Sequence, residues 1–154
     1  ALYYEGQSAL LKKRKDGIEF PRFRDLERLN EEIYEEAVVD IGMRIKEDYD
    51  NIPWFISENG IGIEGEDRYR NKEGYIDDDY RIDFLKGHLQ RALKVRNMGS
   101  NCFGYFVWSF VDNLSAINAF KNRYGLLELD LKTGNRIPKK SLYWFKEIMK
   151  DRQV

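Results

Sequence analysis

The chain has 154 residues, of which 42% are hydrophobic and 14% aromatic, and this composition suits one globular domain with a hydrophobic core. The 26 basic and 27 acidic residues leave a net charge of -1, so no bulk field attracts nucleic acid or anionic lipid. The single cysteine, Cys102, excludes an intrachain disulfide framework. Because Cys102 and His88 are the only soft metal ligands, we expect no zinc site. We also expect no cofactor. No stretch reaches the roughly 18 apolar residues that span a bilayer, and no signal-peptide pattern opens the chain. We therefore expect a cytoplasmic protein that contacts neither nucleic acid nor membrane.

Two stretches have the apolar periodicity of amphipathic helices. The first runs from about Leu29 to Tyr49, and its expected buried face consists of Ile33, Ala37, Val38, Ile41 and Ile45. The second runs from the acidic residues 77–79 to about Gly99, and its expected buried face consists of Ile82, Leu85, Leu89, Ala92 and Leu93. His88 lies at the edge of that second face, where we favour a structural role over that of a ligand or base.

Two apolar runs predict buried strands next to these helices. The first, WFIS at 54–57, ends at Glu58 and the turn residues 59–60, which predicts that Glu58 lies at the rim of a sheet. The motif alone leaves open a strand that merely ends in an acidic residue. The second run, CFGYFVWSF at 102–110, opens into the polar segment 111–115.

The last part of the chain predicts a short strand at 126–131, a turn at 132–135 and a closing helix from Pro138 to about Met149. The resulting order of helix, strand, helix, strand and helix is typical of parallel α/β packing. Two main strands cannot close a barrel or make a well-covered doubly wound sheet. The strand count therefore indicates a piece of a larger fold.

Several motifs stand in a fixed order, namely FISENG at 55–60, DDYRI at 78–82, GYFVWS at 104–109 with DN at 112–113, RYGL at 123–126 and RIPKKS at 136–141. Together they resemble the family 1 glycoside hydrolases, the group of β-glucosidases and 6-phospho-β-glucosidases. FISENG is similar to the family's nucleophile motif I/V-T-E-N-G, with Ser57 in place of Thr. The resemblance covers about residues 33–150.

The resemblance implies an α/β fold that is the C-terminal portion of a (β/α)8 TIM barrel, with about strands seven and eight and their helices. Such barrels typically need about 250 residues. Residues 1–154 are therefore expected to be a C-terminal fragment of a single catalytic domain, an incomplete barrel that self-associates or pairs with the missing barrel half. Sites of these barrels lie at the carboxyl ends of the strands, where Glu58 and Trp108 both fall.

The resemblance also implies catalytic roles. Retaining glycosidases use two carboxylates about 5 to 5.5 Å apart, and Glu58 matches the nucleophile that attacks the anomeric carbon to form a glycosyl-enzyme. Tyr4 matches a tyrosine that orients the nucleophile, although Leu2 stands where the family has Asn. The acid/base glutamate belongs to a T-x-N-E-P-like motif that the sequence lacks, since the pair Asn30-Glu31 has no proline after it. We therefore expect the chain alone to be inactive.

The loop that follows Trp108 indicates whether the substrate sugar is phosphorylated. In ordinary β-glucosidases of the family it carries Glu-Trp, where this chain has Ser115 and Ala116. A carboxylate repels a phosphate, whereas a hydroxyl can donate a hydrogen bond to it. The 6-phospho-glycosidases resemble this chain in having Ser there, followed by a Lys and a Tyr. Tyr124 matches that tyrosine, and Lys121 is the candidate lysine because Asn122 occupies the lysine's own register.

Taken without the resemblance, Ser115, Lys121 and Tyr124 are ordinary loop residues. With it, the sequence predicts a retaining β-glycosidase whose complete form hydrolyses 6-phospho-β-glucosides, with a phosphorylated disaccharide or an aryl glucoside as substrate. Trp108 and Ala116 complete the expected substrate-binding set, and Ala116 in place of Trp favours gluco over galacto configuration. Three alternatives stay open: a plain β-glucosidase, a 6-phospho-β-galactosidase, and a non-catalytic binding module built from half a barrel.

Overall fold

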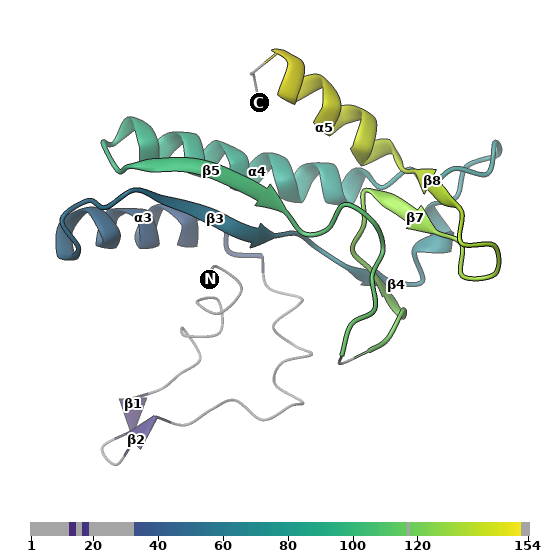
Figure 1. Cartoon of the computed structure of the whole chain (residues 1–154), viewed down its shortest axis with the longest axis horizontal. Coiled ribbons are helices and arrows are strands. Elements are labelled where there is room, and N and C mark those ends of the chain that lie inside the picture. The colour runs from purple at the N-terminus through teal and green to yellow at the C-terminus, as the bar shows by residue number, and fades with distance from the viewer. Residues whose placement is uncertain (1–12, 15–16, 19–32, 117, 152–154) are drawn as a thin grey trace. The chain divides into compact units, whose positions relative to one another are not determined.

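The computed structural model describes residues 13–14, 17–18, 33–116 and 118–151. In chain order (Figure 1), its elements are β1 (Lys13–Arg14), β2 (Gly17–Ile18), α3 (Ala37–Asp48), β3 (Trp54–Asn59), β4 (Ile63–Glu64), the 3-10 helix η1 (Glu66–Tyr69), α4 (Asp79–Asn97), β5 (Cys102–Val107), β6 (Asn122–Arg123), β7 (Leu127–Leu129), β8 (Arg136–Pro138) and α5 (Lys140–Asp151). The described residues fall into two compact units. The first unit holds those up to Asn59 together with His88–Phe106, and the second holds Gly60–Gly87 and those from Val107 onward.

The first unit is built on strands β3 and β5. The two strands are neighbours in one sheet, and Figure 1 shows them side by side and pointing the same way. Helices α3 and α4 supply the apolar side chains that cover one face, and the resulting core consists of Val38, Val39, Trp54, Ile56, Ala92, Val95 and Cys102. Because successive strand residues point to opposite faces, Trp54 and Ile56 are buried while Phe55 between them is exposed. This is the parallel α/β packing that the sequence predicted, and the described strands do not close a barrel.

Gly42 allows helix α3 to lie close to its neighbours. A Cβ atom at Gly42 would be 2.6 Å from the Trp54 ring and 2.6 Å from a Val95 methyl group. The Trp54 indole donates a hydrogen bond to Ser100 Oγ (2.9 Å), and that hydroxyl donates to the Gly42 carbonyl oxygen (2.7 Å). The contact surface of α3 therefore centres on a glycine instead of a large apolar side chain.

The structure differs from the predicted helix faces at Ile33, Ile41 and Leu93. Helix α3 begins at Ala37, so Ile33 lies before it and is 51% exposed. Its buried residues are Val38, Val39 and Gly42, a set rotated toward the glycine and away from the predicted Ile41. In α4 the predicted Leu93 is 45% exposed.

The second unit consists of short elements. Strand β4 pairs antiparallel with β6, and β7 pairs antiparallel with β8. The predicted turn at 132–135 joins β7 to β8, and its Gly134 has a φ of 73°, which glycine adopts readily. Strands β4, β6 and β8 were not predicted, because two or three residues are too few to show a period of two.

No helix within the described parts of the chain is long and apolar enough to cross a membrane. The cytoplasmic location expected from the sequence stays a prediction. Likewise, none of the His, Cys, Asp and Glu side chains that the structure describes form a group able to hold a metal ion.

Candidate functional site

Glu58 lies near the carboxyl end of β3, where its side chain is exposed. The next residue, Asn59, accepts a hydrogen bond at Oδ1 from the Tyr105 hydroxyl of strand β5. Burial raises the pKa of Tyr105, so this hydroxyl keeps its proton and acts as the donor. Strand β5 thus binds the last residue of β3, Asn59, which directly follows Glu58. The expectation that Glu58 lies at a strand end is confirmed.

Gly60 follows this strand end and belongs to the second unit. A Cβ atom placed on Gly60 would overlap the carbonyl oxygen of Trp108, so only a glycine fits against that backbone. Trp108 comes directly after β5, its side chain is 40% exposed, and a cis peptide bond joins it to Ser109. Position 60 therefore requires glycine, because the backbone of Trp108 leaves no room for a Cβ atom.

Replacing Gly60 with Ala should lower the stability of the protein by about 1 to 3 kcal/mol, the usual cost of forcing extra atoms into a packed site. The measurement is the shift in the thermal unfolding midpoint. Gly104→Ala is the matched control, because its Cβ would lie 3.3 Å from Phe55 Cβ and needs only a small adjustment. A Gly60→Ala protein that unfolds at the wild-type temperature would contradict the contact.

The candidate phosphate-binding residues lie in the loop between β5 and β7. The backbone amide and carbonyl of Ser115 exchange hydrogen bonds of 2.9 Å with those of Ala119, which closes a small loop. Ala116 is exposed at its tip. Tyr124 is only 9% exposed, and its ring lies against Gly62, where an added Cβ would overlap it. Ser115 and Tyr124 are thus both held by local contacts of the second unit.

Lys121 is exposed and lines a different feature. A cavity of about 310 Å³ is bounded by Glu64, Gly65, Glu66, Asp67, Phe120, Lys121, Arg123 and Glu128. Lys121 and Arg123 therefore share this cavity with four acidic residues, and neither Ser115 nor Tyr124 belongs to its lining. Arg123 and Asn122 make up strand β6, so their side chains point to opposite faces. Of the three predicted phosphate-binding residues, only Lys121 lines this cavity, and there it lies with Arg123.

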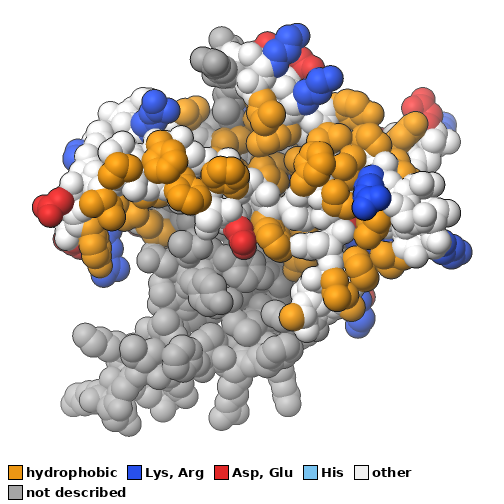
Figure 2. Space-filling model, viewed as in Figure 1, with side chains coloured by type: hydrophobic (Ala, Val, Ile, Leu, Met, Phe, Trp, Pro, Cys, Tyr) orange, Lys and Arg blue, Asp and Glu red, His pale blue; other side chains and the backbone are white. Residues whose placement is uncertain are grey.

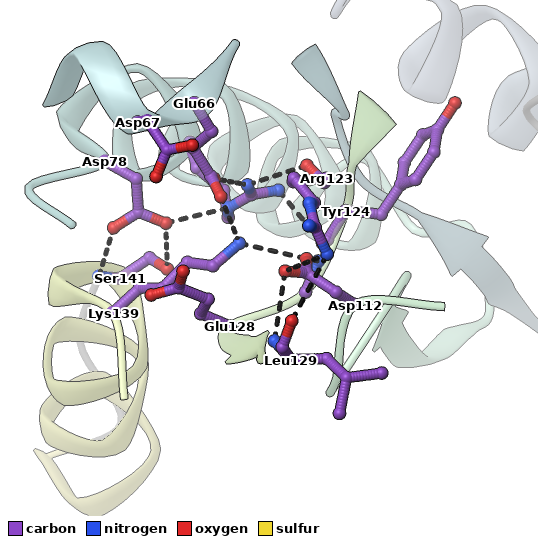
Figure 3. Close-up of polar contacts among 12 residues, drawn as sticks. Glu66, Asp67, Asp78, Asp112, Arg123, Tyr124, Glu128, Leu129, Lys139 and Ser141 are labelled. Atoms are coloured by element: carbon purple, nitrogen blue, oxygen red, sulfur yellow. Dashed lines mark hydrogen bonds and ion pairs between the residues drawn. The ribbon is translucent and has the colours of Figure 1, made fainter. Parts of the chain in front are cut away.

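A buried set of charged residues, here called the charge cluster, lies in the second unit (Figure 3). It consists of Glu66, Asp78, Arg81, Asp112 and Lys139, each at most 4% exposed. Lys139 Nζ donates to Glu66 (2.6 Å) and to Asp112 (3.0 Å). Arg81 donates to Asp78 (2.8 Å) and to Glu66 (2.6 Å). Each of these five charged residues therefore has an opposite charge within hydrogen-bond distance, as the cost of desolvation requires.

The charge cluster ties together segments that are far apart in the sequence. Asp78, just before α4, accepts bonds from the Ser141 amide (2.8 Å) and hydroxyl (2.6 Å) at the start of α5. Asp112 accepts from the amides of Gly125 (2.8 Å) and Leu129 (3.3 Å). The loop that carries Ser115 and Tyr124 is thus attached through Asp112 to Lys139, just before α5, and Asp78 attaches the start of α5 to the start of α4.

Sequence reasoning missed the charge cluster, because charged residues are rarely fully buried. One signal was available in helix α4. Its buried positions apart from Gly87 are spaced four and three residues apart, and they are Arg81, Leu85, His88, Ala92 and Val95. A charged residue in register with an apolar stripe was the indication that Arg81 is buried.

Comparison with known proteins identifies the family. The protein-family model described as "Glycosyl hydrolase family 1" matches residues 13–154 of the sequence, so the chain belongs to glycosyl hydrolase family 1. The chain is 53% identical to 6-phospho-beta-glucosidase GmuD of Bacillus subtilis (strain 168), over 76% of this chain and 25% of that protein. It is 43% identical to a 6-phospho-beta-galactosidase of Clostridium acetobutylicum, over 79% of this chain and 25% of that protein.

Solved structures give the same result. The family 1 b-glucosidase from Thermotoga maritima matches with a TM-score of 0.74 and 33% identity, over 80% of this chain and 27% of the other. The chain spans about a quarter of the length of these relatives. The predicted α/β fold, a part of a (β/α)8 barrel, is confirmed.

Proposed function

We propose that the chain is the C-terminal part of a single catalytic domain, and that the complete enzyme is a retaining β-glycosidase that hydrolyses 6-phospho-β-glucosides. The observation that supports the phosphorylated substrate is the similarity to two relatives named for such substrates. Ser115, where ordinary β-glucosidases have Glu, agrees with it. The glucoside is favoured over the galactoside because identity is 53% to the 6-phospho-beta-glucosidase and 43% to the 6-phospho-beta-galactosidase.

In the proposed reaction, a carboxylate oxygen of Glu58 attacks the anomeric carbon, and the bond to the leaving-group oxygen breaks as that oxygen takes a proton from a second carboxyl group. Water then attacks the anomeric carbon and gives a proton to the second carboxylate, and the bond to Glu58 breaks to return Glu58 as a carboxylate. The exposed position of Glu58 at the carboxyl end of β3 supports this role, because sites of (β/α)8 barrels lie there. Tyr4, the proposed orienting tyrosine, lies outside the described residues.

The phosphate of the substrate is proposed to bind Ser115, Lys121 and Tyr124, with Trp108 and Ala116 contacting the sugar. A hydroxyl and an ammonium both donate hydrogen bonds to phosphate oxygens. Trp108 offers an exposed aromatic surface at the end of β5, and Ala116 is exposed in the same loop as Ser115. Lys121 is also exposed, so its flexible side chain is accessible to an anion.

Replacing Ser115 with Glu should lower kcat/KM for an aryl 6-phospho-β-glucoside more than tenfold beyond any loss on the unphosphorylated glucoside. A hydrogen bond to a charged group contributes about 1.5 to 3 kcal/mol, and the new carboxylate adds repulsion. Ser115→Gln is the matched control, because it has the size of Glu without the charge. Equal losses on both substrates in the Glu variant would refute phosphate recognition by this loop.

Two other functions each have one supporting observation. The 43% identity to a 6-phospho-beta-galactosidase supports a galactoside substrate, which a matched aryl 6-phospho-β-galactoside tests directly. The lack of a T-x-N-E-P-like motif supports a non-catalytic binding module. Turnover of either phosphorylated substrate by the full-length protein would exclude the binding module.

A further inference from the structure

Arg81 binds the main chain at Arg123 and Tyr124. Its guanidinium donates hydrogen bonds to the carbonyl oxygens of Tyr124 (2.9 Å) and Arg123 (3.0 Å). A third bond goes to the carbonyl oxygen of Ile61, one residue before the glycine that contacts the Tyr124 ring. One buried side chain therefore fixes the main chain at Tyr124 and beside its ring.

Arg81 is itself held firmly in the charge cluster. Its Nε and Nη2 atoms donate to Asp78 and Glu66, and Nη2 also lies 2.7 Å from the Tyr80 hydroxyl. That hydroxyl in turn donates to Glu66 (2.6 Å). Burial alone lowers the pKa of Arg81, but its neighbours, chiefly Tyr80 and Glu66, outweigh burial and raise the pKa above the ordinary value. The guanidinium is a permanent, immobile donor.

The side chain of Tyr124 points away from the charge cluster. Figure 3 shows its ring directed to the opposite side of the backbone from Glu66, Asp112 and Lys139. The next residue is held as well, since the Gly125 amide donates to Asp112. The charge cluster therefore binds the backbone of Arg123, Tyr124 and Gly125 through hydrogen bonds. The Tyr124 hydroxyl points away from the carboxylates of the cluster.

We propose that Arg81 is a positioning residue for substrate selection, which fixes the backbone of residues 123–124 so that the Tyr124 hydroxyl meets the phosphate of a 6-phosphorylated glycoside. This inference rests on the proposed function. Arginine suits the role because its planar fork of five N–H donors serves carbonyls and carboxylates together. Lysine has three donors on one atom and cannot span the same acceptors.

Arg81→Lys in the full-length protein tests the proposal, because it keeps the buried charge that the cluster's carboxylates need. The measured quantity is the selectivity, the ratio of kcat/KM for an aryl 6-phospho-β-glucoside to that for its unphosphorylated counterpart. Both substrates are assayed on the same sample, so a loss of folded enzyme cancels in the ratio. Selectivity should fall about tenfold, the value of one hydrogen bond to a charged group, through a raised KM for the phosphorylated substrate.

Arg91→Lys is the matched control, because Arg91 also pairs with a carboxylate, Glu36 (2.5 Å), but lies in the first unit. Its selectivity should equal that of the wild type. Tyr80→Phe is a second, milder variant that removes one contact of Arg81 without removing a charge. It should lower selectivity in the same direction by about threefold, the value of a neutral hydrogen bond.

The outcomes separate this inference from the function on which it rests. Unchanged selectivity in both Arg81→Lys and Tyr80→Phe, while Ser115→Glu still lowers it, would overturn the role of Arg81 alone. A wild-type enzyme with no preference for phosphorylated glucosides would overturn both proposals.

Discussion

Replacing Glu58 with Gln in the full-length protein should lower kcat by more than about 10³-fold, since loss of a nucleophile in a covalent enzyme has effects of this size or larger. Trapping by a 2-fluoro glycoside should be abolished, because an amide does not form the glycosyl-enzyme. The fold should be unaffected, since Glu58 is exposed and exposed substitutions change stability little.

The matched control is Glu47→Gln, the same substitution at another exposed glutamate, in helix α3. It should retain wild-type kcat and normal labelling. Covalent labelling of the Glu58→Gln protein at the wild-type rate and stoichiometry would show that another residue is the nucleophile.

The 154-residue chain by itself should self-associate and should not hydrolyse glycosides. Phe55, Phe103 and Phe106 are 46%, 62% and 58% exposed, and ring contacts join Phe55 to the other two. Figure 2 shows hydrophobic side chains gathered over β3 and β5, and these two strands pair with no further strand among the described residues. An apolar patch beside open strand edges favours association. A missing general acid costs about 10² to 10⁴-fold in rate.

Light scattering of the purified chain over a range of concentrations measures its mass, and a 6-phosphoglucoside assay on the same sample measures turnover. Phe103→Glu should shift the chain toward the monomer, because it places a charge at the most exposed ring of the three. A compact wild-type monomer that turns over at an ordinary enzyme's rate would contradict the proposal that the chain is part of a larger domain.

Much of the fold could be predicted because its main elements carry strong periodic signals. The apolar run at 54–57 before a turn predicted β3, and the helical stripes located α3, α4 and α5. The rotation of α3 toward Gly42 was missed, because a residue without a side chain leaves no mark in an apolar pattern. The short strands β4, β6 and β8 were missed since tertiary pairing and not local sequence determines them.

The site was predictable in part for a similar reason. Glu58 followed from the strand that precedes it, but the surroundings of Ser115 and Tyr124 depend on buried polar contacts between distant segments. Arg81 donates to the Arg123 carbonyl oxygen 42 residues away, and Lys139 donates to Asp112 and Glu66, which are 27 and 73 residues away. No local pattern in the sequence reports such contacts, and only the register of Arg81 with the buried stripe of α4 hinted at them.

The most direct test of the proposed function is the selectivity of the full-length wild-type enzyme. Its kcat/KM is measured for an aryl 6-phospho-β-glucoside and for the same glucoside without phosphate, with the 6-phospho-β-galactoside as a third substrate. We expect the phosphorylated glucoside to be preferred over the plain one by at least about tenfold, the value of one charge-assisted hydrogen bond, and over the phosphorylated galactoside as well. Equal or faster hydrolysis of the plain glucoside would contradict the assignment.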